Sequence, residues 1–182
     1  MRKYWVEELP GMAPLPRCSV GYCRPDRVSC SFIEEGYFVE YLEYPFDRNR
    51  TVAMFFGPKE FLIQCHPVFS TMQALGRSCV ASFSYGDIVR TLREFPESMV
   101  QYRHVRGLYE KKVAERLDMA RMGSDVERFR FVMERQSWVL EKAPGELAAG
   151  YLGVTVRRLK EMREGLKEQV CGRVESAYGL YL

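Results

Sequence analysis

The stretch GELAAGYLGVTVRRLKEMREGL, residues 145–166, combines small side chains, a Tyr-Leu-Gly and a run of bases. Gly153 stands where the chain has to turn sharply, and Thr155 is a good N-cap for a helix that follows. Ala149 is small enough for that helix to cross close over it, with Leu159 facing inward. The pattern predicts two short helices joined by a tight turn, which is the packing pattern of a helix-turn-helix.

The second of these helices is basic. From position 155 to position 167, five bases stand against two acids, a local excess of +3 that equals the net charge of the whole chain. Basic side chains on a helix that fits the major groove neutralise phosphates or reach base edges. The predicted DNA contacts are Thr155, Arg157 and Lys160 at or near bases, and Arg158, Arg163 and Lys167 at phosphates. The alternative is the solvated face of an ordinary helical bundle, which also carries charges.

Composition leaves several classes of protein open and excludes others. The chain has 182 residues, 28% charged side chains and a net charge of +3, which permits a nucleic-acid partner without requiring one. No apolar run approaches the roughly 20 residues that a membrane span needs. The first residues are interrupted by acids and prolines and contain no apolar signal-peptide core. We therefore expect a cytoplasmic protein with no membrane partner.

Neither a metal site nor an enzyme is predicted. The six cysteines include no C-x-x-C pair, and the C-x4-C-x6-C spacing of Cys18, Cys23 and Cys30 lacks the close pair of common metal sites. The adjacent Cys65 and His66 leave a metal or haem open. With two histidines and no nucleophile–base pair, H-E-x-x-H or phosphate loop, the chain has no recognisable catalytic constellation. We expect neither an enzyme nor a resident cofactor.

Residues 16–85 have the pattern of an antiparallel β domain. Short runs rich in β-branched and aromatic residues alternate with turn signals such as Glu34-Glu35-Gly36 and Gly57-Pro58. Many short strands without helices between them indicate a sandwich or barrel. The period then changes to that of helices, so the predicted class is α+β.

One long helix is predicted between residues 97 and 122, where no proline occurs. Its apolar stripe is Val105, Leu108, Tyr109, Val113 and Leu117. Periodicity alone leaves two possibilities: the helix lies on its own sheet, or it pairs with a second copy as a coiled coil. After it, Ser124 with Glu127 three residues on predicts a capping box, so a new helix starts there.

The order of these motifs resembles the Crp/Fnr superfamily of bacterial transcription regulators. The resemblance rests on FIEEGYFVEYLEY (32–44), TVAMFFGPKEFLI (51–63), SCVASFSYGDIVRTLREFPE (78–97) and the segment 127–166. It implies a jelly-roll-like β-roll of the cyclic-nucleotide-binding type at residues 1–96, a dimerisation helix at 97–122 and a winged helix-turn-helix at 123–182. It also implies that the apolar stripe of the long helix forms the interface of a homodimer.

The effector pocket implied by the resemblance departs from the family pattern. Ile63 and Gln64 stand where a Gly-Glu pair for the ribose is expected, and Arg77-Ser78 stands for the Arg that would pair with a cyclic phosphate. We therefore expect a degenerate pocket that does not bind cAMP tightly.

Together these patterns predict a dimeric, DNA-binding transcription regulator. Its expected partners are double-stranded DNA, a second copy of the chain, RNA polymerase and a small-molecule effector of unknown identity. The alternative is a ligand-sensing or protein-interaction scaffold whose helix-turn-helix no longer reads DNA. Glu161 and Glu164 on the outward face keep that alternative open, because carboxylates repel phosphates.

Overall fold

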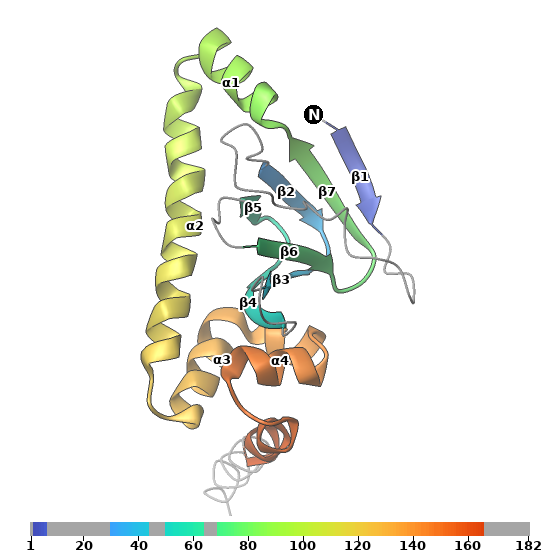
Figure 1. Cartoon of the computed structure of the whole chain (residues 1–182), viewed down its shortest axis with the longest axis vertical. Coiled ribbons are helices and arrows are strands. Elements are labelled where there is room, and N and C mark those ends of the chain that lie inside the picture. The colour runs from blue at the N-terminus through green and yellow to red at the C-terminus, as the bar shows by residue number, and fades with distance from the viewer. Residues whose placement is uncertain (1, 7–29, 44–49, 64–68, 166–182) are drawn as a thin grey trace, which may run out of the picture. The chain divides into compact units, whose positions relative to one another are not determined.

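The computed structural model describes residues 2–6, 30–43, 50–63 and 69–165 of the chain (Figure 1). It divides into two compact units, Met1–Asp118 and Met119–Leu182. The first unit contains the strands, helix α1 (Tyr85–Glu94) and most of helix α2 (Ser98–Arg121), and the second contains the remaining helices. The predicted α+β class is confirmed. The three-part division into residues 1–96, 97–122 and 123–182 stays a prediction.

Two antiparallel sheets make up the β part of the first unit, one with the strand order β1-β7-β2-β5 and the other β4-β3-β6. The strands are β1 (Arg2–Val6), β2 (Cys30–Glu35), β3 (Phe38–Glu43), β4 (Arg50–Phe56), β5 (Phe61–Ile63), β6 (Phe69–Ala74) and β7 (Ser78–Phe83). Strands β2 to β7 fall within residues 16–85, where the sequence predicts short strands, whereas β1 lies outside that range. Five residues carry little periodicity, and β1 forms along the edge of β7.

The turn between β2 and β3 is tighter than the sequence predicts. Glu34 and Glu35 belong to β2, so the turn is left to Gly36 and its neighbour. Gly36 has a φ of 96°, and a Cβ there would lie 2.0 Å from Oγ of Ser78. Only glycine meets both demands, because it has no side chain and adopts positive φ without strain.

Strand β3 is buried on both of its faces. Phe38 and Val39 are both 0% exposed, and so is Glu40. In register, Glu40 lies between Met54 on β4 and Met72 on β6, and both methionines belong to the core cluster. A carboxyl group is therefore placed in an apolar core.

Burial dominates the chemistry of Glu40. Neither carboxyl oxygen forms a hydrogen bond of normal geometry within the described part of the chain, although the Ser70 hydroxyl is near enough to favour the ionised form slightly. Because removal from water disfavours the charged carboxylate, burial raises the pKa of Glu40 to about 7, and Ser70 opposes this only in part.

Helix α1 begins at Tyr85, directly after its N-cap Ser84. The Ser84 hydroxyl accepts a hydrogen bond from the Asp87 amide at 3.1 Å, and the Asp87 carboxylate accepts one from the Ser84 amide at 3.1 Å. This reciprocal capping box satisfies two amide groups that would otherwise lack partners at the helix start.

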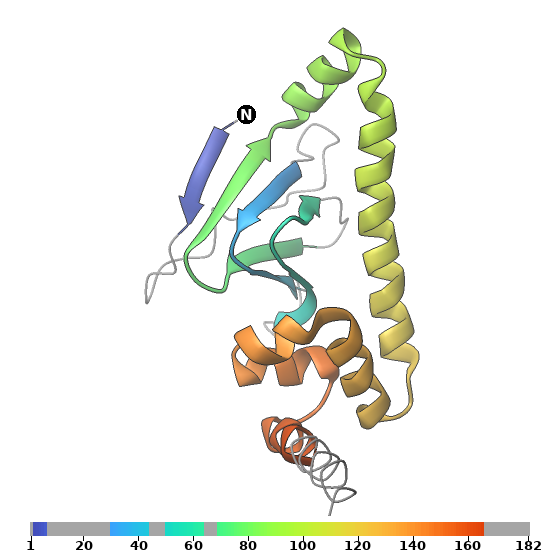
Figure 2. The same ribbon diagram turned by 180° about the vertical axis from the view of Figure 1, so that it is seen from behind.

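Helix α2 lies alongside the strands of the first unit in both views (Figures 1 and 2). The Lys112 ammonium pairs with Glu60 and lies 4.6 Å from the ring centroid of Phe56. One turn further on, Nε of Arg116 donates to the carbonyl oxygen of Ala53 at 2.9 Å. Two basic side chains thus hold the helix to β4 and to the turn before β5.

The predicted dimer stripe divides between two surroundings. Tyr109 and Val113 pack against the core cluster of their own unit. Leu108 and Leu117 are 49% and 52% exposed, and Val105 is partly buried. Nine helical residues correspond to about two and a half turns, so Leu108 and Leu117 lie on opposite flanks of α2. One face of the helix therefore packs on its own sheet, which was one of the two possibilities that periodicity left open.

The second unit consists of helices. It contains α3 (Asp125–Lys142), α4 (Gly145–Leu152) and a further helix at residues 156–165, called the second helix below. Ser124 is the N-cap of α3 as predicted, but its side chain forms no cap hydrogen bond, so the predicted capping box with Glu127 is wrong. Asp125 and Glu127 in the first turn of α3 instead favour the positive end of its dipole. The wing implied after the second helix lies outside the described residues.

Within the described ranges, no helix has both the length and the apolar character needed to cross a membrane.

Stability of the first unit should fall as pH rises through the range in which Glu40 titrates. Below about pH 4.5 the carboxyl is protonated in both states. Between pH 4.5 and about 7 the unfolded chain releases the proton while the folded chain keeps it, so the free energy of unfolding falls. At roughly 1.4 kcal/mol per pKa unit, we expect a loss of about 3 kcal/mol across this range.

Urea unfolding of the wild type and of Glu40→Gln across that range measures the effect. The glutamine variant should lack this pH-dependent loss, while Glu94→Gln, an exposed control on α1, should retain it. Equal slopes for all three proteins would show that Glu40 is ionised in the folded chain.

Candidate nucleic-acid interface

The turn between α4 and the second helix is formed by a left-handed residue. Gly153 has φ 68° and ψ 37°, and its amide donates to the carbonyl oxygen of Gly150 at 3.2 Å. The Val154 amide donates to the carbonyl oxygen of Ala149 at 3.0 Å. These bonds satisfy carbonyl groups that the end of α4 would leave without partners. The sharp turn predicted at Gly153 is confirmed.

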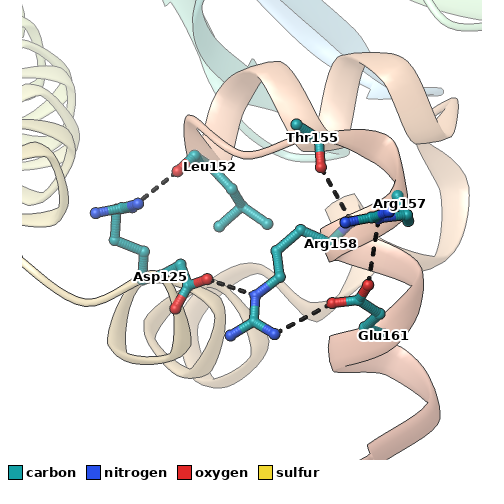
Figure 3. Close-up of polar contacts among 7 residues, drawn as sticks. Asp125, Leu152, Thr155, Arg157, Arg158 and Glu161 are labelled. Atoms are coloured by element: carbon teal, nitrogen blue, oxygen red, sulfur yellow. Dashed lines mark hydrogen bonds and ion pairs between the residues drawn. The ribbon is translucent and has the colours of Figure 1, made fainter.

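Thr155 starts the second helix in the predicted way. Its hydroxyl accepts a hydrogen bond from the Arg158 amide at 3.2 Å, as an N-cap side chain does (Figure 3). Its carbonyl accepts from the Leu159 amide at 3.0 Å, which is the first turn of the helix. A role of Thr155 at DNA bases stays a prediction.

The inward face of the two helices is apolar and closely packed. Its buried members, between 0% and 8% exposed, are Ala148, Ala149, Tyr151, Leu152, Leu159 and Met162. Ala149 at 2% exposure agrees with the prediction that a small residue is needed there. Burial of this face fixes which side chains of the second helix point outward.

Arg158 is held between two carboxylates (Figure 3). Its Nε lies 2.6 Å from Oδ2 of Asp125 at the start of α3, and another guanidinium nitrogen lies 3.2 Å from Oε2 of Glu161. The hydrogen bond from Arg158 lowers the pKa of Asp125, and the bond to Asp125 raises the pKa of Arg158. The guanidinium predicted to contact phosphate is therefore engaged within the second unit.

Two further arginines bond to helix ends. Arg163 donates to the carbonyl oxygen of Leu140 near the end of α3. Arg128 donates from two nitrogens, to the carbonyl oxygens of Leu152 and Met122, both at 2.8 Å. Guanidinium groups suit this role, because terminal carbonyls of helices lack partners and carry partial negative charge.

Arg157 and Lys160 form the outward basic face of the second helix. The Arg157 side chain is 90% exposed and makes one loose ion pair, 3.5 Å to Oε1 of Glu161. Lys160 is exposed and has no ion pair within the described part of the chain. Three residues apart on one helix, the two side chains lie on the same side. Lys167, the sixth predicted contact, lies outside the described residues.

The residues implied for the effector pocket do not come together. Ile63 pairs with Cys30 at one end of β2, whereas Cys79, next to Ser78, pairs with Glu35 at the other end. Five strand residues span about 17 Å, so these positions are far apart along the sheet. Ser78 is fully buried, and its hydroxyl donates to the carbonyl oxygen of Gly76 at 3.0 Å. Arg77 is exposed in the turn, and Gln64 lies outside the described residues.

Within the described ranges, no three histidine, cysteine or acidic side chains are grouped so that they could hold a metal ion. Cys30 and Cys79 are the cysteines inside those ranges, and the thiol of Cys79 donates to Glu34 at 3.5 Å. Cys18, Cys23, Cys65 and His66 lie outside them.

Sequence reasoning missed Asp125 and Arg128 as part of this region. Their positions in the sequence do not mark them as functional, because charged residues in the first turns of a helix are common. Only the packing of α3 against the second helix brings Asp125 to Arg158, 33 positions away. The bend of α3 at Gln136, with φ −146° and ψ 50°, was likewise not predicted.

No protein-family model matches the sequence, and no curated protein is significantly similar to it. Solved structures are similar over most of its length. The structure of FixK2 from Bradyrhizobium japonicum is 12% identical, with a TM-score of 0.72, covering 92% of this chain and 85% of that chain. A CooA mutant from Carboxydothermus hydrogenoformans is 14% identical, with a TM-score of 0.65, covering 92% of this chain and 77% of that chain.

A regulator from Eubacterium rectale assigned to the Crp/Fnr family has a TM-score of 0.57 at 11% identity, covering 80% of this chain and 72% of that chain. The chain therefore has a Crp/Fnr-like fold, which confirms the resemblance seen in the sequence. At these identities the likeness concerns the fold.

Replacing Gly153 by alanine should destabilise the second unit by about 1 kcal/mol, because a Cβ is unfavourable in the left-handed region. No atom lies within 4 Å of the position that this Cβ would take, so the loss would come from the backbone rather than from a clash. Thermal unfolding followed by circular dichroism measures it.

Gly86→Ala is the matched control, since Gly86 lies in α1 without a positive φ, and the atom nearest to the Cβ it would gain is Oγ of Ser84 at 3.7 Å. Alanine there should stabilise the chain by up to about 1 kcal/mol through helix propensity. Equal effects at the two positions would contradict the role of the left-handed turn.

Proposed function

We propose that this chain is a DNA-binding transcription regulator that uses the second helix, as part of a winged helix-turn-helix, to contact the major groove. The observation that carries the proposal is the outward pair Arg157 and Lys160 on a helix whose opposite face is buried. Both side chains can reach phosphates or base edges without losing a packing contact. The Crp/Fnr-like fold supports the same function.

Binding would require a homodimer, because a single reading helix makes too few contacts for useful affinity. We place the dimer contact on the side of α2 that faces away from its own sheets. Val100 is 69% exposed there, and Gly107 and Ala114 follow at seven-residue steps, which repeat on one side of a helix. Leu108 and Leu117 would flank this contact. Two reading helices about one turn of DNA apart would then meet two half-sites.

The effector domain would not respond to cAMP. The positions implied for ribose and phosphate are separated along β2, at opposite ends of the strand. An effector of another class and a contact with RNA polymerase remain part of the proposal, as does a cytoplasmic location. We propose no catalytic activity.

One observation favours a second candidate, a sensor or scaffold that acts through protein contacts. Glu161 pairs with both Arg157 and Arg158, so part of the positive charge of the second helix is neutralised. Salt dependence separates the two candidates, since a protein that binds through phosphates loses affinity steeply as salt rises. A gel shift on genomic fragments selected with the purified protein, at about 50 and about 200 mM salt, provides that test. A DNA affinity that does not change with salt, or the absence of a gel shift, would favour the scaffold function.

Replacing Arg157 and Lys160 together by alanine should weaken specific DNA binding by at least about a hundredfold, because base and phosphate contacts are lost together. Footprinting on the selected fragments measures this, and sedimentation checks that the dimer remains. Glu164→Ala, an exposed change on the same helix, serves as the control. An unchanged footprint of the double variant would refute the assignment of the second helix.

Titration calorimetry with cAMP should give no binding at micromolar concentration. The physical reason is that, in the described ranges, the positions implied for ribose and phosphate lie at opposite ends of β2, where Cys30 pairs with Ile63 and Glu35 pairs with Cys79. A micromolar dissociation constant would show that residues outside those ranges complete the pocket.

A further inference from the structure

The ion pair between Asp125 and Arg158 joins the start of α3 to the first turn of the second helix (Figure 3). It is a short contact, 2.6 Å between Nε and Oδ2, and it bridges 33 positions of sequence. The same guanidinium reaches Glu161, one turn further along its own helix, at 3.2 Å. Arg158 therefore links α3 to the second helix through Nε and bonds to its own helix through a second nitrogen.

The charge around Arg158 does not suit a phosphate contact. Arg158 contributes one positive charge, and Asp125 and Glu161 contribute one negative charge each, so the three sum to −1. Addition of Arg157, which also pairs with Glu161, brings the four groups to zero. A phosphate that approached Arg158 would meet two carboxylates already bonded to it, which opposes binding. Lys160, in contrast, forms no ion pair within the described part of the chain.

The position of Arg158 does suit control of the orientation of the second helix. Arg157 and Arg158 are adjacent, so their side chains leave the helix about 100° apart, and rotation of one moves the other equally. A second link, from Arg163 to the Leu140 carbonyl, lies about 7 Å further along the helix. Two links at different heights restrain both rotation about the helix axis and tilt.

We infer that Arg158 is a positioning residue, which through Asp125 aims Arg157 and Lys160 at DNA and does not itself contact a phosphate. This inference rests on the proposed function. It assigns opposite roles to two neighbouring arginines that the sequence presents alike. It also means that Asp125, an acidic residue outside the second helix, strengthens DNA binding.

The decisive variant is Asp125→Asn, measured in the full-length protein on a selected genomic fragment. If Arg158 positions the helix, loss of the carboxylate releases the arginine and DNA binding weakens by about fivefold, the scale of an exposed ion pair. If Arg158 contacts a phosphate, removal of a competing carboxylate makes binding stronger. The two roles thus predict changes of opposite sign.

Glu164→Gln is the matched control, since it removes one exposed carboxylate from the second helix itself. It should strengthen binding slightly or leave it unchanged, because the repulsion of phosphates falls. A weakening of binding in Asp125→Asn against this control supports the inference.

The salt dependence gives an independent readout. Arg158→Gln should weaken binding while the slope of log affinity against log salt stays that of the wild type, because no phosphate contact is lost. Lys160→Gln should reduce the slope by about one for each helix that engages DNA. The double variant Asp125→Asn with Arg158→Gln should bind no more weakly than either single variant, since both remove the same contact.

Stronger binding by Asp125→Asn, or a reduced slope in Arg158→Gln, would overturn the inference while DNA binding by the wild type still stands. Absence of salt-dependent binding by the wild type would overturn the proposed function and this inference together. Circular dichroism of each variant checks that the helices remain, and Arg158→Lys keeps the charge in case Arg158→Gln does not fold. Under the inference that lysine variant binds more weakly than wild type, because an ammonium group cannot bridge both carboxylates as the planar guanidinium does.

Discussion

The left-handed backbone at Gly153 is the constraint on which the second unit depends. It ends α4, satisfies the carbonyls of Ala149 and Gly150, and sets the angle at which the second helix leaves. Leu159 and Met162 then turn inward against the alanines of α4, and the remaining side chains of that helix have to point outward. The exposure of Arg157 and Lys160 is thus a consequence of the turn and of the apolar packing, not of their own charge.

Charged groups inside the first unit show how burial alters the meaning of a residue. Glu40 lies between two methionines and has its pKa raised to about 7, so its form changes near neutrality. Lys112 is nearly as enclosed, with a side chain 12% exposed, but it meets Glu60 and the face of Phe56. Both groups lose interactions with water when they are buried. Lys112 regains part of that interaction energy from its opposite charge, whereas Glu40 has no opposite charge beside it in the described part of the chain.

Identical local patterns gave different outcomes in two places. Ser84 and Ser124 both precede a helix and both have an acidic residue three positions on, yet only Ser84 forms the reciprocal capping box. Arg157 and Arg158 are neighbours of the same type, yet one is exposed and the other bridges to Asp125. For the two arginines the difference comes from Asp125, which lies across from Arg158 in space but 33 positions away in the sequence.

The sequence by itself determined the α+β class, the order of strands and helices, the turn at Gly153 and the inward face of the second helix. These follow from periodicity, from the φ preference of glycine and from the short range of capping contacts, all of which are local. Only the tertiary structure decided that β3 is buried on both faces, that the stripe of α2 divides between its own core and the surface, and that Arg158 and Arg163 bond internally. The physical reason is that burial and ion pairing depend on elements far apart in the chain, and their meeting is fixed by packing rather than by spacing.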